Sequence, residues 1–298
     1  MRRLGTVDVM LLATVVIWSF NITVTRYVLT HGFGPLSYAA VRYGAAVALF
    51  LAITFALERS FAIGGGRSLQ LLGIATVTLL INQICFVYAL KLTTATTVAL
   101  ILGATPIFTG LVSFAVGLER PSSRFWLATA ISFAGVALVA VGSGGKLSSD
   151  LGGELLAVAL AASWSVYTVA IAPLMRRFSP YRISAVVLLA MWVPLAALAA
   201  PQLGEQDYGG LGWLVWLCLG YAIAGPLVLT NVLWFKAIAR VGPSRATLVG
   251  NLQPFLAAVI AALVLSEELD ALQAVGGVAI LAAVLLERKG QRLPVPPE

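Results

Sequence analysis

The chain contains ten long apolar runs, separated by short segments that carry most of its charged residues. A helix needs about 20 mostly apolar residues to cross a bilayer. Strands of a membrane barrel would instead show shorter segments of alternating hydrophobicity. The runs therefore predict membrane-spanning α-helices. The predicted spans are 9–28, 36–57, 69–90, 96–116, 124–141, 153–172, 183–200, 211–235, 246–265 and 271–286.

The shortage of charged side chains excludes an ordinary water-soluble protein. Only 10% of the 298 residues are charged and 60% are hydrophobic, whereas soluble domains carry about 25% charged residues. The chain therefore needs a lipid bilayer around it. The net charge of +7 comes mostly from short loops, so we expect no nucleic-acid partner. No CxxC motif occurs and His31 is the only histidine, so we expect no metal site and no cofactor.

Lysine and arginine are distributed unequally between the two sides of the predicted membrane. If the N-terminus is cytoplasmic, only Lys91 and Lys146, with Arg26 close by, lie on the outer side. The cytoplasmic side then holds Arg2, Arg3, Arg59, Arg67, Arg120, Arg124, Arg176, Arg177, Arg182, Lys236, Arg240, Arg245, Arg288, Lys289 and Arg292. Cytoplasmic loops are enriched in these residues. The bias predicts a multi-pass protein with an even number of spans and both termini in the cytoplasm.

The second half of the chain repeats the features of the first half after a shift of 148 positions. Pro106 falls on Pro254, and Glu119 falls on Glu267. Each half has five predicted spans, and because five is odd the halves cross the membrane in opposite directions. This predicts an all-α membrane protein of ten transmembrane helices in two inverted repeats, an architecture of many secondary transporters. The predicted repeats are residues 8–143 and 152–287, followed by a short basic cytoplasmic tail, 288–298.

Several segments resemble the EamA-type family of the drug/metabolite transporter superfamily. They include VRYGAA in the second predicted span, TTATTVALILGATPIFTGLVSF in the fourth and VGPSRATLVGNLQPFLAAVIAALVLSEEL around the ninth. The resemblance implies a ten-helix inner-membrane carrier. It also implies a central cavity lined by spans 3, 4, 8 and 9 with parts of 1 and 6. Such carriers move small organic solutes, often outward: amino acids, other metabolites and sometimes toxic compounds.

Polar and aromatic side chains inside the predicted spans are the candidate substrate contacts, because polar groups are costly in lipid and commonly face the protein interior. These candidates are Asn21, Asn82, Gln83, Tyr88, Trp164, Tyr167, Asn231, Trp234, Asn251 and Gln253. The 148-residue shift aligns Asn82-Gln83 with Thr230-Asn231, which predicts two faces of one site near the middle of the membrane. The alternative is that these amides only form hydrogen bonds between helices.

Two prolines and one arginine in the predicted spans have two interpretations each. Pro106 and Pro254 each remove a backbone donor in mid-span, which kinks a helix; a fixed bend is favoured over a moving hinge. Arg42 is a possible charge partner for an anionic group of the substrate. Its position at the start of the second span favours the alternative, a side chain that reaches the membrane interface.

These observations together predict a secondary transporter of the inner membrane that exports small organic metabolites, such as amino acids, by alternating access through a central cavity. The alternatives are a carrier for drugs or toxic compounds, and a channel or sensor that does not transport. No enzyme is expected, because paired aspartates and phosphate-binding loops are missing from the sequence. The expected partners are a small-molecule substrate and lipid, and the sequence leaves both a monomer and a homodimer open.

Overall fold

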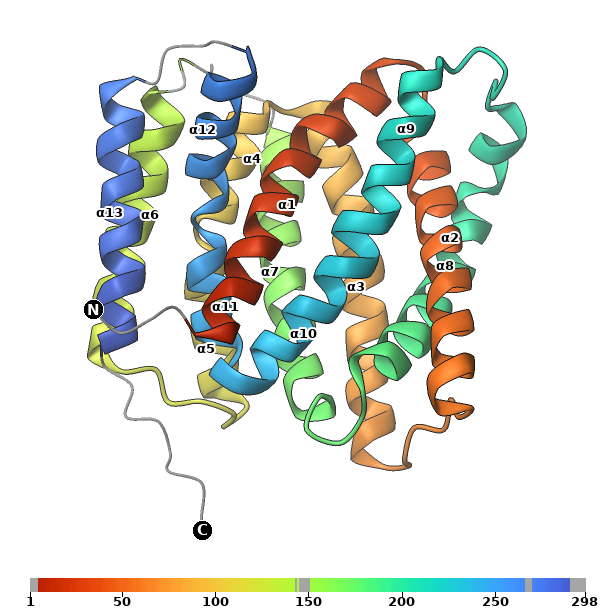
Figure 1. Ribbon diagram of the computed structural model, residues 1–298, viewed down its shortest axis with the longest axis horizontal. Helices are drawn as coiled ribbons and strands as arrows, with labels where there is room; N and C mark the ends of the chain where they lie inside the picture. Colours follow the sequence, from red (N-terminus) through yellow and green to blue (C-terminus); the bar gives the residue numbers. More distant parts are fainter. Residues whose placement is uncertain (1–4, 143, 145–150, 266–269, 290–298) are drawn as a thin grey trace.

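The structure is a computed structural model that describes residues 5–142, 144, 151–265 and 270–289. Within these residues all regular secondary structure is helical (Figure 1). The first half forms α1 (Thr6–Thr30), α2 (Pro35–Glu58), α3 (Arg67–Leu92), α4 (Ala95–Leu102), α5 (Thr105–Ala115) and α6 (Ser123–Gly142). The second half forms α7 (Leu151–Leu174), α8 (Pro180–Glu205), α9 (Trp213–Ala222), the π-helix η1 (Ile223–Leu229), α10 (Thr230–Val241), α11 (Pro243–Gly250), α12 (Gln253–Leu265) and α13 (Ala271–Lys289).

Eight helices of the described part are long and apolar enough to cross a membrane, and Ala271–Glu287 is a shorter apolar helix. Two of the eight, Thr97–Ala115 and Trp213–Val241, combine several of the labelled elements. The predicted ninth span divides into α11 and α12. The prediction of an all-helical, multi-pass membrane protein is confirmed. Glu267 and most of the predicted tail lie outside the described residues.

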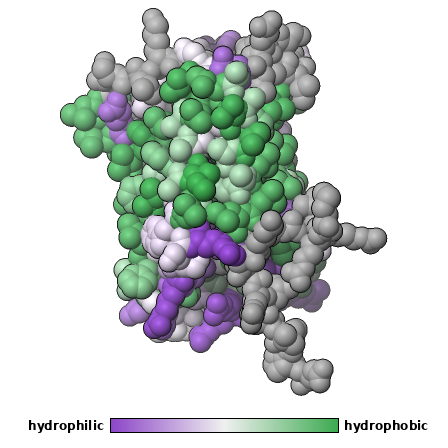
Figure 2. Space-filling view, turned by 90° about the vertical axis from the view of Figure 1, so that its left-hand side faces the viewer, coloured by the Kyte–Doolittle hydropathy of each residue, from purple (hydrophilic) through white to green (hydrophobic). Residues whose placement is uncertain are grey.

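The surface of the molecule carries a broad apolar belt. Phe55, Phe114 and Val278 each expose almost two thirds of their surface. Figure 2 shows hydrophobic residues covering the middle of one face, with hydrophilic residues gathered toward its lower part. Helices satisfy their backbone hydrogen bonds internally, which lipid requires. Exposed apolar side chains around such helices therefore match a bilayer.

The order of the helices brings the start of α1 and the end of α13 to the same end of the bundle. α1 starts at the lower end of Figure 1 and α13 finishes there, whereas α7 starts at the upper end. Helix α3 packs along α7, α6 along α13, and α2 along α8. In the last two pairs, a helix of the first half lies against the helix at the same position in the second half.

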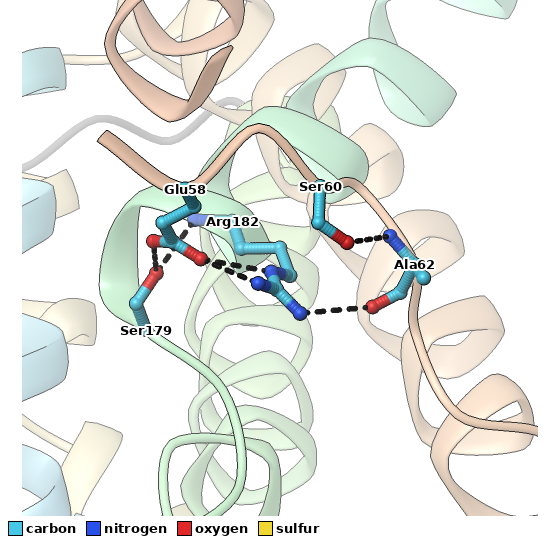
Figure 3. A network of polar contacts seen from close by, with 5 residues as sticks. All are labelled: Glu58, Ser60, Ala62, Ser179 and Arg182. Atoms are coloured by element: carbon cyan, nitrogen blue, oxygen red, sulfur yellow. Dashed lines mark hydrogen bonds and ion pairs between the residues drawn. The ribbon is translucent and has the colours of Figure 1, made fainter. Parts of the chain in front are cut away.

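A polar cluster fastens α2 to α8 at the lower end (Figure 3). The carboxylate of Glu58, the last residue of α2, accepts a hydrogen bond from the hydroxyl of Ser179 and forms an ion pair with Arg182, with 2.8 Å between Nη2 and Oε2. Arg182 also donates to the carbonyl of Ala62 over 3.2 Å. Ser179 caps α8 by accepting from the backbone N–H of Arg182. The α2–α3 loop is thus held against the start of α8.

A second polar cluster joins the end of α5 to the start of α11 at the lower end. Glu119 accepts hydrogen bonds from both the backbone N–H and the hydroxyl of Ser244, with 3.1 Å between Oε2 and the nitrogen. Gly242 turns the chain between α10 and α11 with a φ of 81°, and a side chain there would collide with Glu119. Arg245 pairs with Asp8 of α1 over 3.4 Å. A carboxylate at a helix N-terminus is stabilised by the helix dipole.

Candidate functional site

Two of the membrane-spanning segments are broken helices. The chain turns at Gly103-Ala104 between α4 and α5, and again between α11 and α12. Pro106 and Pro254 are the second residues of α5 and α12, where a missing N–H leaves no helical hydrogen bond unmade. Each span is thus interrupted in the turn just before its proline, and the proline begins the half-helix that follows. The preference for a fixed bend over a moving hinge stays a prediction.

A cavity of about 190 Å³ lies beside these breaks, between helices of both halves. Of the ten predicted substrate contacts, nine line this cavity: Asn21, Asn82, Gln83, Trp164, Tyr167, Asn231, Trp234, Asn251 and Gln253. Pro254 and Arg42 line it as well. The chain has four asparagines, and all of them lie here. The structure thus brings the intramembrane amides together around one space.

Tyr88 and Pro106 do not line the cavity. Tyr88 is half-buried and packs against the main apolar core, while Pro106 is buried within α5. The cavity also includes Phe86 and Thr247, which sequence analysis did not single out. Phe86 follows Gln83 by three residues. A spacing of three or four residues places two side chains on the same face of a helix. The spacing of such residues from the predicted amides could therefore have identified them as cavity-lining residues from the sequence.

Arg42 is buried in the bundle, with 2% of its surface exposed. Its guanidinium carbon lies 5.0 Å from the ring centre of Tyr38, 5.2 Å from that of Tyr43 and 5.9 Å from that of Phe86. The favoured interpretation of Arg42 as an interface residue is therefore wrong. Aromatic faces attract a guanidinium at such distances, and here they hold the charge beside the cavity.

A directional chain of hydrogen bonds runs from Arg42 through α3 to α7. Nη2 of Arg42 donates to Oε1 of Gln83 over 2.9 Å, and Nε2 of Gln83 donates to Oδ1 of Asn82 over 2.9 Å. Nδ2 of Asn82 then donates to the carbonyl of Leu160 over 3.0 Å. Each amide is oriented by its neighbour, because its oxygen accepts from one residue and its nitrogen donates to the next. This series of hydrogen bonds fixes the side chains of one wall of the cavity.

Three tryptophans from α1, α7 and α10 form an aromatic wall. The ring centres of Trp18 and Trp164 are 5.4 Å apart with planes at 80°, and those of Trp18 and Trp234 are 5.0 Å apart. Nε1 of Trp18 donates to Oγ1 of Thr230 over 2.8 Å. Tyr167 extends the cluster from Trp164, with ring centres 5.4 Å apart. Such pairs are more rigid than aliphatic contacts and present flat apolar faces.

The amides of the second half also bond across helices. Nδ2 of Asn251 donates to the carbonyl of Gly103 over 2.9 Å and to the hydroxyl of Ser132 over 3.0 Å. Gln253 donates to the carbonyl of Trp18 over 3.2 Å. Asn231 has one long contact, 3.4 Å, to the hydroxyl of Ser184. These amides therefore hold helices together and also line the cavity. Their contact with substrate stays a prediction.

The chemistry available at this site is that of a binding pocket. Its walls offer amides, indole rings and one guanidinium. Among the described residues, no three His, Cys, Asp or Glu side chains lie together in a way that could hold a metal ion. Rigid walls with a few oriented polar groups are typical of small-molecule sites.

Comparison with known sequences identifies the family of this chain. The EamA-like transporter family matches the chain twice, over residues 5–141 and 151–287. The chain belongs to the EamA-like transporter family. The predicted resemblance is confirmed, and this EamA-like protein is a multi-pass membrane transporter.

Individual relatives of this EamA-like protein match it over almost its whole length. An uncharacterized transporter of Archaeoglobus fulgidus is 26% identical over 292 residues, which cover 93% of this chain and 95% of that protein. The uncharacterized transporter YyaM of Bacillus subtilis is 26% identical over 297 residues, 96% of this chain and 94% of its own. A protein of known crystal structure superimposes with a TM-score of 0.74 at 19% identity, over 96% of this chain and 99% of that one. That last likeness concerns the fold alone.

Proposed function

We propose that this EamA-like protein is a secondary transporter that exports small organic metabolites, such as amino acids, across the inner membrane by alternating access. One observation carries the proposal: a single cavity between the two halves collects all four asparagines and three tryptophans from helices of both halves. Intramembrane polar groups that face the bundle interior or a water-filled cavity mark substrate paths in membrane proteins. Broken helices beside such a site are a recurrent feature of secondary transporters.

Matching hydrogen bonds in the two halves support the proposed inverted repeat. The hydroxyl of Ser19 donates to the carbonyl of Gln253 over 3.0 Å, and the hydroxyl of Ser165 donates to the carbonyl of Thr105 over 3.2 Å. Both serines follow a tryptophan, and the two acceptors are 148 positions apart. Each half thus supplies a serine that bonds to the broken helix of the other half. This reciprocity is the behaviour of two units related by a two-fold axis.

The size of the cavity favours metabolites over drugs. Pockets for drug-sized ligands measure about 300–1,000 Å³, whereas this one measures about 190 Å³. A carrier of bulky toxic compounds would need a larger space. The clustering of polar groups around one cavity, rather than along a continuous pore, favours a carrier over a channel.

The distribution of charge supports an orientation in which the lower end of Figure 1 faces the cytoplasm. Glu58, Arg182, Arg245 and Asp8 lie in the polar clusters of that end, and most arginines belong to its loops. Loops rich in arginine stay in the cytoplasm. In this orientation α1 starts, and α13 ends, on the cytoplasmic side.

Metabolite profiling of culture medium tests the proposed export. We expect overexpression of the wild type to enrich one class of small metabolite outside the cells. The variants Asn82→Leu and Asn231→Leu should reduce that enrichment, because they remove amides from the cavity wall. Gln70→Leu is the matched control, since Gln70 is an exposed amide on the same helix as Asn82. Equal enrichment from all four proteins, or accumulation inside the cells, would contradict the proposal.

A further inference from the structure

We infer that the substrate is a monoanion, in which one carboxylate-type group pairs with Arg42 and a flat apolar body lies against the tryptophan wall. The inference rests on the proposed function, because it takes the central cavity as the transport site. It narrows the substrate class within that function. The argument begins with the charge of Arg42.

Arg42 brings a full positive charge into the bundle without an acidic partner among the described residues around it. The described residues that line the cavity include no Asp and no Glu. Among the described residues, the acceptors that its side chain contacts are neutral: the amide of Gln83 and the hydroxyl of Tyr43. A guanidinium is effectively always charged and carries five N–H donors. A buried charge is costly unless it is paired, so the site is electrostatically incomplete when empty.

The unused donors show where the missing group belongs. Nε of Arg42 is buried, and no residue in the described part of the chain accepts a hydrogen bond from it. The contacts with Tyr38, Tyr43 and Phe86 attract the guanidinium through their ring faces, but a ring face supplies no acceptor for Nε. Arginine binds planar carboxylates with two parallel N–H donors. Arg42 is part of the cavity lining, so a carboxylate bound there would neutralise its charge.

A second donor without a partner and the tryptophan wall indicate the chemistry of the rest of the ligand. Trp234 lines the cavity, and its Nε1 is buried with no hydrogen-bond partner among the described residues. It can donate to an oxygen of the ligand. The rings of Trp18, Trp164 and Trp234 form the flat apolar side of the same space. The site therefore matches a small acid with an aromatic or similarly flat body.

The charged and polar groups of the cavity lining also favour a simple carboxylic acid over a zwitterionic amino acid as the ligand. A zwitterionic ligand brings an ammonium group that needs a negative partner or several acceptors. Among the described lining residues, the buried side-chain acceptor without a hydrogen-bond partner is Oδ1 of Asn21. One neutral oxygen is a poor substitute for a carboxylate. A dianion would in turn leave one negative charge unpaired beside the single guanidinium, so a monoanion is the best match.

Three probes with one carbon skeleton test the inference. We would measure equilibrium binding of 3-phenylpropionate, phenylalanine and 3-phenylpropanol to the purified full-length protein in lipid nanodiscs. The expected order of affinity is 3-phenylpropionate first, with the zwitterion and the alcohol at least about tenfold weaker. Arg42→Gln should remove that preference, lowering affinity for 3-phenylpropionate at least about tenfold and changing affinity for the alcohol by less than about twofold.

Arg26→Gln is the matched control, because Arg26 is an exposed arginine on α1 and does not line the cavity. It should behave as the wild type. The probe order in the wild type tests the inference even if Arg42→Gln does not fold. Wild-type protein that binds phenylalanine or the alcohol as tightly as 3-phenylpropionate, or that does not bind 3-phenylpropionate at millimolar concentration, would overturn it. Saturable uptake of phenylalanine into proteoliposomes would then still uphold the proposed transport function.

Discussion

Asn251 donates a hydrogen bond to the carbonyl of Gly103 over 2.9 Å, and these two residues are 148 positions apart. The shift that relates the halves in the sequence therefore joins two residues in direct contact. Both lie at the breaks of their spans, before the half-helices that Pro106 and Pro254 begin. A residue touches its own counterpart only close to a symmetry axis. The proposed two-fold axis accordingly passes between the two breaks, at the cavity wall.

Replacing Asn251 should weaken the contact between the broken helices. Asn251→Ala removes hydrogen bonds to Gly103 and to Ser132, and each such bond in a membrane protein contributes about 0.6 kcal/mol. We expect the free energy of unfolding in detergent to fall by about 1 kcal/mol. Asn231→Ala is the comparison, since its one contact is 3.4 Å long, and it should cost less. An equal loss in both variants would contradict the role given to Asn251.

The crossing of α6 and α13 depends on two glycines. A Cβ atom on Gly135 would lie 2.7 Å from the carbonyl oxygen of Gly276, and one on Gly276 would lie 2.5 Å from the carbonyl oxygen of Gly135. Gly135→Ala should therefore push the helices apart and lower the free energy of unfolding by about 1–3 kcal/mol. Gly73→Ala, a helical position with open space around it, should be neutral or slightly stabilising. Similar melting temperatures for both variants would argue against close packing at this crossing.

The contact of Glu119 with Ser244 should keep the lower end of the cavity closed. In a protein without native cysteines, Thr247→Cys places a thiol in the cavity lining close to this contact. Glu119→Gln removes the charge at the start of α11, so we expect faster labelling of that cysteine by a membrane-impermeant maleimide.

Labelling in the Glu119→Gln protein needs a control that removes a carboxylate elsewhere. Glu154→Gln serves, because Glu154 lies in the first turn of α7, at the upper end of the bundle. It should leave the labelling rate of the Thr247→Cys thiol unchanged. Unaltered labelling in the Glu119→Gln protein as well would show that the contact does not restrict access.

Transport of an anion should respond to membrane potential more than to a pH gradient. An inside-negative potential drives one negative charge outward with about 2.3 kcal/mol per 100 mV. The described lining of the cavity offers no carboxylate to carry a proton. Efflux of 3-phenylpropionate from proteoliposomes should therefore accelerate when potassium and valinomycin make the interior negative. Protein-free liposomes correct for leakage of the neutral acid, and strict dependence on an imposed pH gradient would contradict this expectation.

Much of the site was predictable because lipid leaves few places for polar groups. Asn21, Asn82, Asn231 and Asn251 stand out as amides in apolar runs, and each lies in the cavity lining. Tyr88 is also a polar side chain in an apolar run, but it packs outside the lining. Hydropathy reports the depth of a residue in the membrane, not the side of the helix on which it lies. In a bilayer the surface is as apolar as the core, so lipid-facing and interior faces differ little in composition.

The sequence by itself determined the apolar helices, the need for lipid, the doubled order of features and the family. These properties depend on residue type along the chain, so they can be predicted without any knowledge of tertiary contacts. Only the tertiary structure decided that Arg42 lies beside the cavity, that Pro106 and Pro254 begin half-helices, and that three tryptophans meet. Each of these outcomes depends on how a helix is rotated about its axis and on which neighbour it packs against. Packing of distant segments sets both, and no local pattern encodes them.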